Sequence, residues 1–331
     1  MSQHVLITGG AGFIGFSLAK ILVANGYRVC LADNLTRGVM DDDLNNLLLR
    51  SEASFSHVDL IDASAVLSLG TNFDAIFHLG AIIGVQNVLE RPFYVLVDNT
   101  RMLENVIMLA QRQDKLARFL FASTSEVYAG TLKHFDLPIP TPESVSLAVT
   151  ELRMPRTTYM LSKIMGEAMV QQSELPFTIF RPHNIYGPRM GMAHVIPEQL
   201  KKAFEAKSGD QLDVYSPEHT RAFCYIDDAI EMLYKMLMLN SCIGQTLNLG
   251  TEEPEVTIRE VVQTCISVTN KNISIKNLAP MPGSPVRRAP DMSLTSSLLN
   301  YQSKVNLDEG IAKTWDWYCK HVFASGGSCF R

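Results

Sequence analysis

A glycine-rich turn near the amino terminus places the tightest constraint on how this chain can fold. The segment Gly9–Gly15 (GGAGFIG) lies between His4–Thr8, an apolar run typical of a buried strand, and Phe13–Asn25, an apolar run of helical length. The spacing Gly10-x-Gly12-x-x-Gly15 removes Cβ atoms where a strand turns tightly into a helix that must pack against it. The amide groups at the start of such a helix favour a bound diphosphate. The turn therefore predicts a dinucleotide-binding strand–helix unit.

One acidic residue indicates which dinucleotide the unit takes. Asp33 follows a second strand-like run, Tyr27–Ala32, and stands 18 residues after Gly15. A carboxylate at this place accepts hydrogen bonds from the ribose hydroxyls of NAD and repels the 2′-phosphate of NADP. Arg37 could temper this preference without reversing it. The predicted cofactor is NAD.

Strand-like and helix-like segments alternate through the first half of the chain. Further short apolar runs read as strands, at 75–79, 118–123 and 177–181, and helical patterns lie between them at 100–112 and 157–173. This alternation predicts an α/β fold with a Rossmann-like, doubly wound parallel sheet. Beyond the last of these strands, prolines and helical patterns at 198–207, 227–238, 258–268 and 307–319 indicate a second, smaller C-terminal domain. We expect domains of residues 1–181 and 182–331, with some segments of the second returning to the first.

Composition excludes several other classes of protein. The chain has 331 residues, 47% of them apolar, which suffices for one large or two modest domains. A net charge of −5 argues against non-specific binding of nucleic acid. The six cysteines show neither a C-x-x-C pair nor metal-ligand spacing, so neither a disulfide framework nor a metal site is expected. No signal peptide or membrane span is visible, and we expect a cytoplasmic protein without membrane contact.

Two further motifs carry groups suited to acid–base chemistry. Tyr159 and Lys163 stand four residues apart, on one face of a predicted helix. A cation close to a phenol lowers its pKa, so that it can take a proton from a hydroxyl near neutral pH. Upstream, Thr124, Ser125 and Glu126 follow a predicted parallel strand, at the edge of the sheet where ligands bind. Thr124 or Ser125 would share the substrate hydroxyl with Tyr159, and Glu126 is a candidate acid or base.

Taken in order, the motifs of the chain resemble those of a known family. They are the glycine loop with Asp33, Asp59-Leu60, His78–Ala81 (HLGA), Ser123–Glu126 (STSE), Tyr159 with Lys163, Arg181–Arg189 (RPHNIYGPR) and Arg287–Asp291 (RRAPD). The chain is similar over nearly its whole length to the extended short-chain dehydrogenase/reductase family, in its nucleotide-sugar epimerase/dehydratase branch. The resemblance implies a second domain that binds a nucleotide-diphosphate sugar. It also implies a homodimer formed through the helices at 100–112 and 157–173.

The resemblance also assigns roles to individual residues. It implies that Tyr159 is the catalytic base and that Lys163 bonds the nicotinamide ribose. The expected cofactor-binding residues are Gly9, Gly12, Phe13, Ile14, Gly15, Asp33, Asn34, Asp59, Leu60, Leu79, Gly80, Ala81, Asn99, Ser123, Tyr159, Lys163 and Pro182. The expected substrate-binding residues are Asn184, His194, Val195, Arg221 and Arg288, with the two arginines on the substrate diphosphate. Gly80 and Ala129 depart from the family pattern, which usually has alanine and glycine there.

The family shares one first step, oxidation of the sugar at C4, and divides after it. Our first expectation is a 4-epimerase acting on a UDP-hexose or UDP-hexuronate. The alternatives are a UDP-glucuronate decarboxylase and a 4,6-dehydratase, both of which would use Glu126. Ser125, where dehydratases carry aspartate, disfavours the dehydratase. Ser125 and Glu126 with Arg288 resemble the decarboxylases, whereas the segment 82–85 (IIGV) does not resemble their loop. A non-catalytic NAD-binding regulator is a remote alternative, because such proteins usually lose the Tyr/Lys pair.

Overall fold

The computed structural model describes residues 3–280 and 285–323, and its centre is a seven-stranded parallel sheet. The strand order is β11-β6-β5-β4-β1-β2-β3, so the chain moves outward from β1 in both directions. The strands are β1 (His4–Thr8), β2 (Arg28–Asp33), β3 (Ala53–His57), β4 (Ala75–His78), β5 (Arg118–Ala122), β6 (Phe177–Pro182) and β11 (Gln245–Leu249). The predicted doubly wound α/β fold is confirmed. Order reverses between β1 and β4, where the carboxyl ends of such strands form a ligand crevice.

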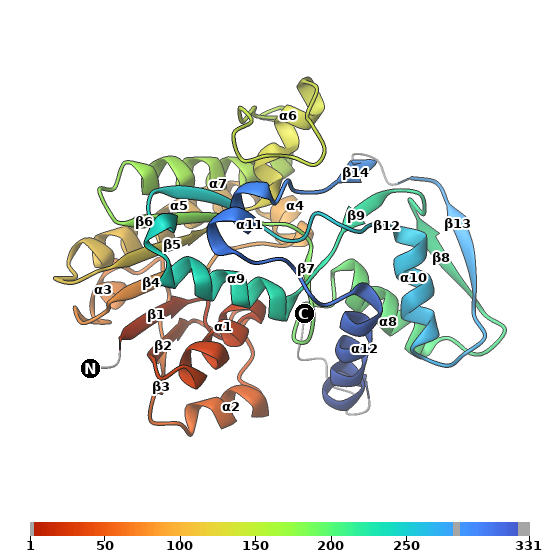
Figure 1. The fold of residues 1–331 in the computed structure, drawn as a ribbon, viewed down its shortest axis with the longest axis horizontal. Helices are drawn as coiled ribbons and strands as arrows, with labels where there is room; N and C mark the ends of the chain where they lie inside the picture. Colours follow the sequence, from red (N-terminus) through yellow and green to blue (C-terminus); the bar gives the residue numbers. More distant parts are fainter. Residues whose placement is uncertain (1–2, 281–284, 324–331) are drawn as a thin grey trace.

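Helices cover both faces of this sheet (Figure 1). One layer contains α3 (Ala63–Leu67), α5 (Pro92–Gln111) and α7 (Pro155–Gln171), and the other contains α1 (Phe13–Ala24) and α9 (Ile226–Met238). The strand residues between the layers, such as Ile7, Ile76 and Leu120, are fully buried. Burying both faces explains why the central strands β1, β4 and β5 are apolar runs without alternation.

Several predicted boundaries differ from those in the structure. Helix α5 begins at Pro92, eight residues before the predicted start, because a proline is tolerated in the first turn of a helix. Strands β3 and β11 were not predicted, because their sequences are short and contain polar residues. Strand β11, from beyond residue 181, pairs with β6 at the edge of the main sheet. Ala129 begins α6 (Ala129–His134) with right-handed helical backbone angles, which alanine adopts without strain.

The remaining elements form a smaller lobe beside the sheet (Figure 1). Its helices are α8 (Val195–Glu205), α10 (Ile258–Ser267) and α12 (Leu307–Tyr318). Its strands are β8 (Gln211–Tyr215) with β13 (Ser274–Leu278), and β12 (Glu255–Thr257) with β9 (Thr220–Ala222) and β14 (Arg287–Arg288). The shorter elements of the chain are α2 (Asp42–Leu48), α4 (Val85–Glu90), α11 (Ser293–Leu299), β7 (Ile185–Tyr186), β10 (Cys224–Tyr225), and η1 (Ser125–Tyr128), η2 (Asn240–Cys242) and η3 (Cys319–Phe323).

The helices predicted to form a dimer interface, α5 and α7, lie side by side on the same face of the sheet. Each also presents an exposed apolar side chain, Phe93 on α5 and Met165 on α7. The homodimer stays a prediction. Within the described residues, no helix has both the length and the apolar character that crossing a bilayer requires.

Candidate active site

The glycine turn has the shape that a dinucleotide diphosphate requires. An ideal Cβ on Gly15 would lie 2.3 Å from the carbonyl oxygen of Gly9, so only glycine allows α1 to pack this closely against the turn. Gly12 precedes the first helical residue, Phe13, and supplies no side chain to cap the helix. The amide groups of the first turn, including those of Phe13 and Ile14, are therefore available to a ligand, and the helix dipole favours an anion there. The residues present fit a dinucleotide.

Asp33 lies at the carboxyl end of β2 and joins the two loops around this turn. Its Oδ2 accepts a hydrogen bond from the amide of Ala11 at 3.1 Å, and its Oδ1 accepts one from the amide of Leu35 at 2.8 Å. Burial raises the pKa of Asp33, and these two amides oppose that rise by stabilising the carboxylate. Each carboxylate oxygen accepts more than one hydrogen bond. Asp33 can thus hold the loops and still accept ribose hydroxyls. The neighbouring Asn34 side chain accepts the amide of Thr36.

The expected adenine-side residues come from the ends of β3 and β4. Asp59 is exposed and accepts the amide of Ile61 at 3.0 Å, whereas Leu60 is buried. An ideal Cβ on Gly80 would lie 2.5 Å from the Cδ1 of Leu60, so the glycine makes room for that side chain. This contact explains why glycine rather than alanine stands between Leu79 and Ala81.

Two other expected cofactor residues already have partners within the protein. Asn99 accepts the amide of Ile82 at 2.7 Å and donates to its carbonyl oxygen at 3.1 Å, which fixes the segment after β4. The Ser123 hydroxyl donates to Oε1 of Glu167 at 2.5 Å. Pro182 closes β6 at the same edge of the sheet. These residues shape the crevice through which the cofactor would pass.

Tyr159 and Lys163 lie on one face of α7 beside the end of β5. Thr124 lies close enough to the Tyr159 hydroxyl to lower its pKa, and Thr124 Oγ1 accepts a hydrogen bond from the amide of Glu126 at 3.2 Å. Lys163 is 5% exposed, and its Nζ donates to the carbonyl oxygen of Ala122 at 2.7 Å. The expectation that Lys163 lowers the pKa of Tyr159 is wrong for the protein without cofactor. Burial raises the pKa of Tyr159 to about 12, and the ammonium faces a backbone carbonyl instead.

The buried ammonium of Lys163 predicts a pH-dependent stability in the protein without cofactor. Burial lowers the pKa of Lys163 from 10.5 to about 8, although Glu167 opposes the shift. Between these two values the unfolded chain binds more protons than the folded chain, so the contribution of Lys163 to stability rises with pH. We expect Lys163→Met to be stabilising near pH 7 and to lose this advantage as the pH rises to about 10. Denaturant unfolding at several pH values measures it, with the exposed Lys201→Met as the control. The prediction is contradicted if the free energies of unfolding of Lys163→Met and wild type differ by the same amount at every pH.

Glu126 forms an ion pair with Arg288 that joins the strand end to the smaller lobe. Arg288 Nη1 lies 2.8 Å from Glu126 Oε1. Arg288 lowers the pKa of Glu126 most, and Arg156 and Arg221 lower it further. The carboxylate is therefore ionised at neutral pH, so it can accept a proton but is not an acid there. The three arginines around one carboxylate leave a net positive charge, which suits an acidic substrate.

Some of the expected substrate-binding residues lie beside Glu126, and others are hydrogen-bonded to backbone carbonyl groups nearby. Arg221 on β9 is paired in register with Arg288 on β14, and its guanidinium donates to the carbonyl oxygens of Thr220 and Pro285 at 2.6 and 2.7 Å. Asn184 has a positive φ of 43° and donates to the carbonyl oxygen of Ala222 at 3.0 Å. His194 precedes α8, and Val195 is its first residue. Of these residues, Arg288 makes direct contact with a predicted catalytic side chain.

Two arginines near the catalytic groups were missed as site residues. Arg37 lies close enough to Tyr159 and His194 to influence the pKa of each. Because Arg37 follows β2 in the sequence, its position indicates a role near the cofactor ribose. Nothing in the sequence predicts that it lies near the catalytic tyrosine. Arg156 precedes Tyr159 by three residues on α7, and helical spacing places the two residues on one side of the helix. That spacing could have identified Arg156.

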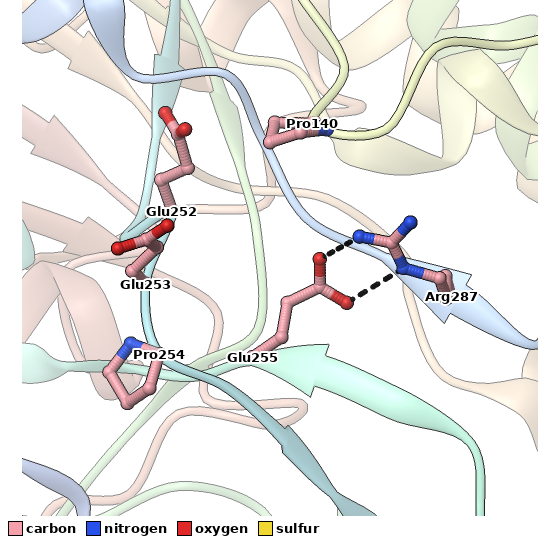
Figure 2. A pocket seen from close by; sticks show the side chains of 6 residues that line it. All are labelled: Pro140, Glu252, Glu253, Pro254, Glu255 and Arg287. Carbon is pink, nitrogen blue, oxygen red and sulfur yellow. Dashed lines mark hydrogen bonds and ion pairs between the residues drawn. The ribbon is translucent and has the colours of Figure 1, made fainter.

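A cavity of about 490 Å³ lies between Arg287 of β14 and the segment 252–255 (Figure 2). Arg287 forms a two-pronged ion pair with Glu255 at its edge, and Glu252, Glu253 and two prolines line the rest. Adjacent residues of a strand point to opposite faces, which separates the Arg287–Glu255 pair from the Arg288–Glu126 pair. The glutamates make this cavity unsuitable for a diphosphate. Arg287 also lines a small pocket with Ser125, Tyr128 and Arg288, so the cavity borders the candidate active site.

Comparison with known proteins identifies the relatives of this chain. The model of the NAD dependent epimerase/dehydratase family matches residues 5–250. A UDP-N-acetyl-alpha-D-glucosaminuronate decarboxylase from Bacillus cytotoxicus is 30% identical, over 96% of this chain and 98% of its own length. UDP-glucuronic acid decarboxylase 1 from Xenopus tropicalis is 31% identical, over 97% of this chain and 73% of its own. The crystal structure of a UDP-glucuronic acid 4-epimerase from Bacillus cereus has a TM-score of 0.78 and 25% identity, over 96% of this chain and 99% of that one.

Proposed function

The chain belongs to the NAD dependent epimerase/dehydratase family, and we propose that it decarboxylates a UDP-hexuronate after oxidising C4 of the sugar. The observation that carries this choice is the 2.8 Å ion pair between Glu126 and Arg288, next to Tyr159 and Thr124. Epimerisation at C4 has no step for Glu126, whereas an Arg288 that only bound the substrate diphosphate would serve either reaction. Relatives at 30% and 31% identity are named as decarboxylases of UDP-hexuronates, which supports the same choice.

NAD supplies, when bound, an acceptor for the hydrogen on C4 and a positive charge that lowers the pKa of a nearby phenol. The protein residues that would hold it are the amides of the glycine turn, Asp33 and Lys163. Tyr159 then takes the proton of the C4 hydroxyl, and Thr124 holds the same oxygen through a hydrogen bond. Both groups lie where a negative charge on that oxygen would be stabilised.

Oxidation at C4 turns a hexuronate into a β-keto acid. When its C5–C6 bond breaks, carbon dioxide leaves and the electron pair forms an enolate whose charge lies on the C4 oxygen. The hydroxyls of Tyr159 and Thr124 would stabilise that oxygen, and water would supply the proton that is added at C5. The hydrogen taken from C4 would then return to it, and Tyr159 would give back the proton of the C4 hydroxyl, so that the product is a nucleotide pentose. In place of the diphosphate contact expected from the resemblance, we assign Arg288 to the C6 carboxylate of the substrate. We assign Glu126 to holding Arg288, because Glu126 is ionised and cannot donate a proton at neutral pH. The charges of Arg156 and Arg221 would favour an acidic sugar over a neutral one.

A 4-epimerase acting on the same acidic sugar is the second candidate. The segment 82–85, which does not resemble the loop of decarboxylases, favours it. The Bacillus cereus 4-epimerase, whose solved complex contains UDP-glucuronic acid and NAD, has a closely similar fold. Tyr159, Thr124 and Lys163 would serve this reaction as well, and only the fate of the 4-keto sugar would differ.

Product analysis distinguishes these functions. The purified protein is incubated with NAD and each of four sugars: UDP-glucuronate, UDP-N-acetylglucosaminuronate and their neutral counterparts UDP-glucose and UDP-N-acetylglucosamine. We expect an acidic sugar to lose the mass of one carbon dioxide, and the neutral sugars to be poor substrates. An acidic product of unchanged mass with a new sugar NMR spectrum supports the epimerase instead. Conversion of the neutral sugars alone contradicts both functions.

A further inference from the structure

Tyr128 is buried beneath the candidate active site and links two parts of it that are distant in sequence. It is the last residue of η1, the short helical turn that also carries Ser125 and Glu126, and it is 4% exposed. Its hydroxyl accepts a hydrogen bond from Arg181 Nη1 at 2.8 Å and donates one to Asn248 Oδ1 at 2.9 Å. Burial raises the pKa of Tyr128 to about 12, so the hydroxyl keeps the proton that it donates to Asn248.

On one side the hydroxyl connects to α7, the helix of Tyr159 and Lys163. Arg181 forms a bidentate ion pair with Glu167, in which Nε lies 2.8 Å from Oε1 and Nη2 lies 2.6 Å from Oε2. Glu167 stands one helical turn after Lys163 and two turns after Tyr159, so all three lie on the same face of α7. Glu167 also accepts the hydroxyl of Ser123, which immediately precedes Thr124. The path from α7 through Glu167 and Arg181 thus returns to η1 at Tyr128.

On the other side the hydroxyl connects to the segment that carries Arg288. The side-chain nitrogen of Asn248, Nδ2, donates hydrogen bonds to the carbonyl oxygens of Thr141 at 2.9 Å and Asp291 at 3.0 Å. These two bonds fix the amide so that Oδ1 faces Tyr128. Asp291 stands three residues after Arg288, so the same network also holds the strand end that presents Arg288 to Glu126.

We propose that the Tyr128 hydroxyl is a positioning group, which sets the turn bearing Thr124, Ser125 and Glu126 against Tyr159 on one side and Arg288 on the other. Every residue on this path, from Ser123 through Glu167, Arg181 and Tyr128 to Asn248, is at most 4% exposed. Buried, fully paired networks hold their members in one arrangement. A shift of about 1 Å between reacting groups is enough to slow a reaction by about 100-fold. The proposal rests on the C4 oxidation within the proposed function, and it holds for decarboxylation and for epimerisation alike.

Tyr128→Phe tests the proposal, because it removes only the hydroxyl oxygen. The two groups bonded to that oxygen, on Arg181 and Asn248, each keep a second hydrogen-bond partner. Arg181 Nη1 keeps the carbonyl oxygen of Glu143 at 3.1 Å, and Asn248 Oδ1 keeps His183 Nε2 at 3.1 Å, so we expect the variant to fold. We expect kcat to fall by about 10- to 100-fold, with the KM for the nucleotide sugar and the Kd for NAD within about 2-fold of wild type. The deuterium isotope effect on kcat with a 4-deuterated sugar should rise, because C4 oxidation becomes slower than the other steps.

Tyr301→Phe is the matched control. Its hydroxyl donates to Asp228 Oδ1 at 2.7 Å, so the variant loses a comparable bond away from the site. We expect it to lower Tm and leave kcat unchanged. An unchanged kcat and isotope effect in Tyr128→Phe would overturn the positioning role, as would a loss of kcat that only matches the fraction unfolded. The identity of the wild-type product tests the proposed function separately, since the kcat ratio can be measured whichever product forms.

Discussion

Replacing Tyr159 by phenylalanine is expected to lower kcat by about 1,000-fold or more, with every nucleotide sugar that the wild type converts. The substitution removes the hydroxyl that lies beside Thr124 and leaves the ring that α7 carries into the site. Without that oxygen no group on α7 can take the C4 proton, because Lys163 faces the carbonyl oxygen of Ala122. Binding should change little, so we expect the Kd for NAD and for the nucleotide sugar to stay within about 3-fold of wild type.

A control is available in Tyr27, a buried tyrosine far from the crevice. It precedes β2 at the amino end of the sheet, opposite the crevice, and its hydroxyl contacts the sulfur of Met238. Tyr27→Phe should keep full activity. Steady-state rates and isothermal titration with NAD measure both variants. A Tyr159→Phe protein that retains more than about a tenth of wild-type kcat contradicts the assignment of Tyr159 as the base.

Breaking the Glu126–Arg288 pair is expected to have the second largest effect. Arg288→Gln removes the cation that we assign to the substrate carboxylate, and we expect decarboxylation to slow by about 100-fold or more. Glu126→Gln keeps the shape of the side chain but removes the charge that holds Arg288, and we expect a loss of similar size. A 4-epimerase should instead tolerate Glu126→Gln with only a modest loss, because its chemistry does not involve this carboxylate.

The adjacent ion pair provides the control for these substitutions. Arg287 pairs with Glu255 across the neighbouring cavity (Figure 2), and Arg287→Gln should change the rate by less than about 2-fold. Rates of carbon dioxide release, measured for the three variants at saturating substrate, compare the two pairs directly. An Arg288→Gln protein that keeps the rate of the wild type would remove Arg288 from the proposed mechanism.

The first half of the fold could be predicted because its segments are locally consistent. The apolar run His4–Thr8, the glycine turn and the helix from Phe13 each favour the same conformation at the level of sequence. Strand β3 and strand β11 could not be predicted in this way. Ala53–His57 contains two serines and a histidine, and Gln245–Leu249 has polar residues at three of five positions, so pairing with neighbouring strands decides their structure.

The candidate site could be predicted in its residue types but not in its contacts. Tyr159, Lys163 and the turn at Thr124 were expected together, and the structure places them together. The ion pair between Glu126 and Arg288 spans 162 residues, and spacing along a chain carries no information about such a contact. The direction of the Lys163 ammonium likewise depends on where the carbonyl of Ala122 lies after folding. The same contacts move our preference from epimerisation to decarboxylation.

The fate of C6 tests the proposed function most directly. The enzyme is given NAD and a UDP-hexuronate labelled with ¹³C at C6 of the sugar, and the label is followed by NMR. If Arg288 and Glu126 serve decarboxylation, the label appears as carbon dioxide and bicarbonate in step with a nucleotide pentose. If the label stays in a nucleotide hexuronate while the sugar changes configuration at C4, the enzyme is an epimerase and the proposed role of the ion pair is wrong.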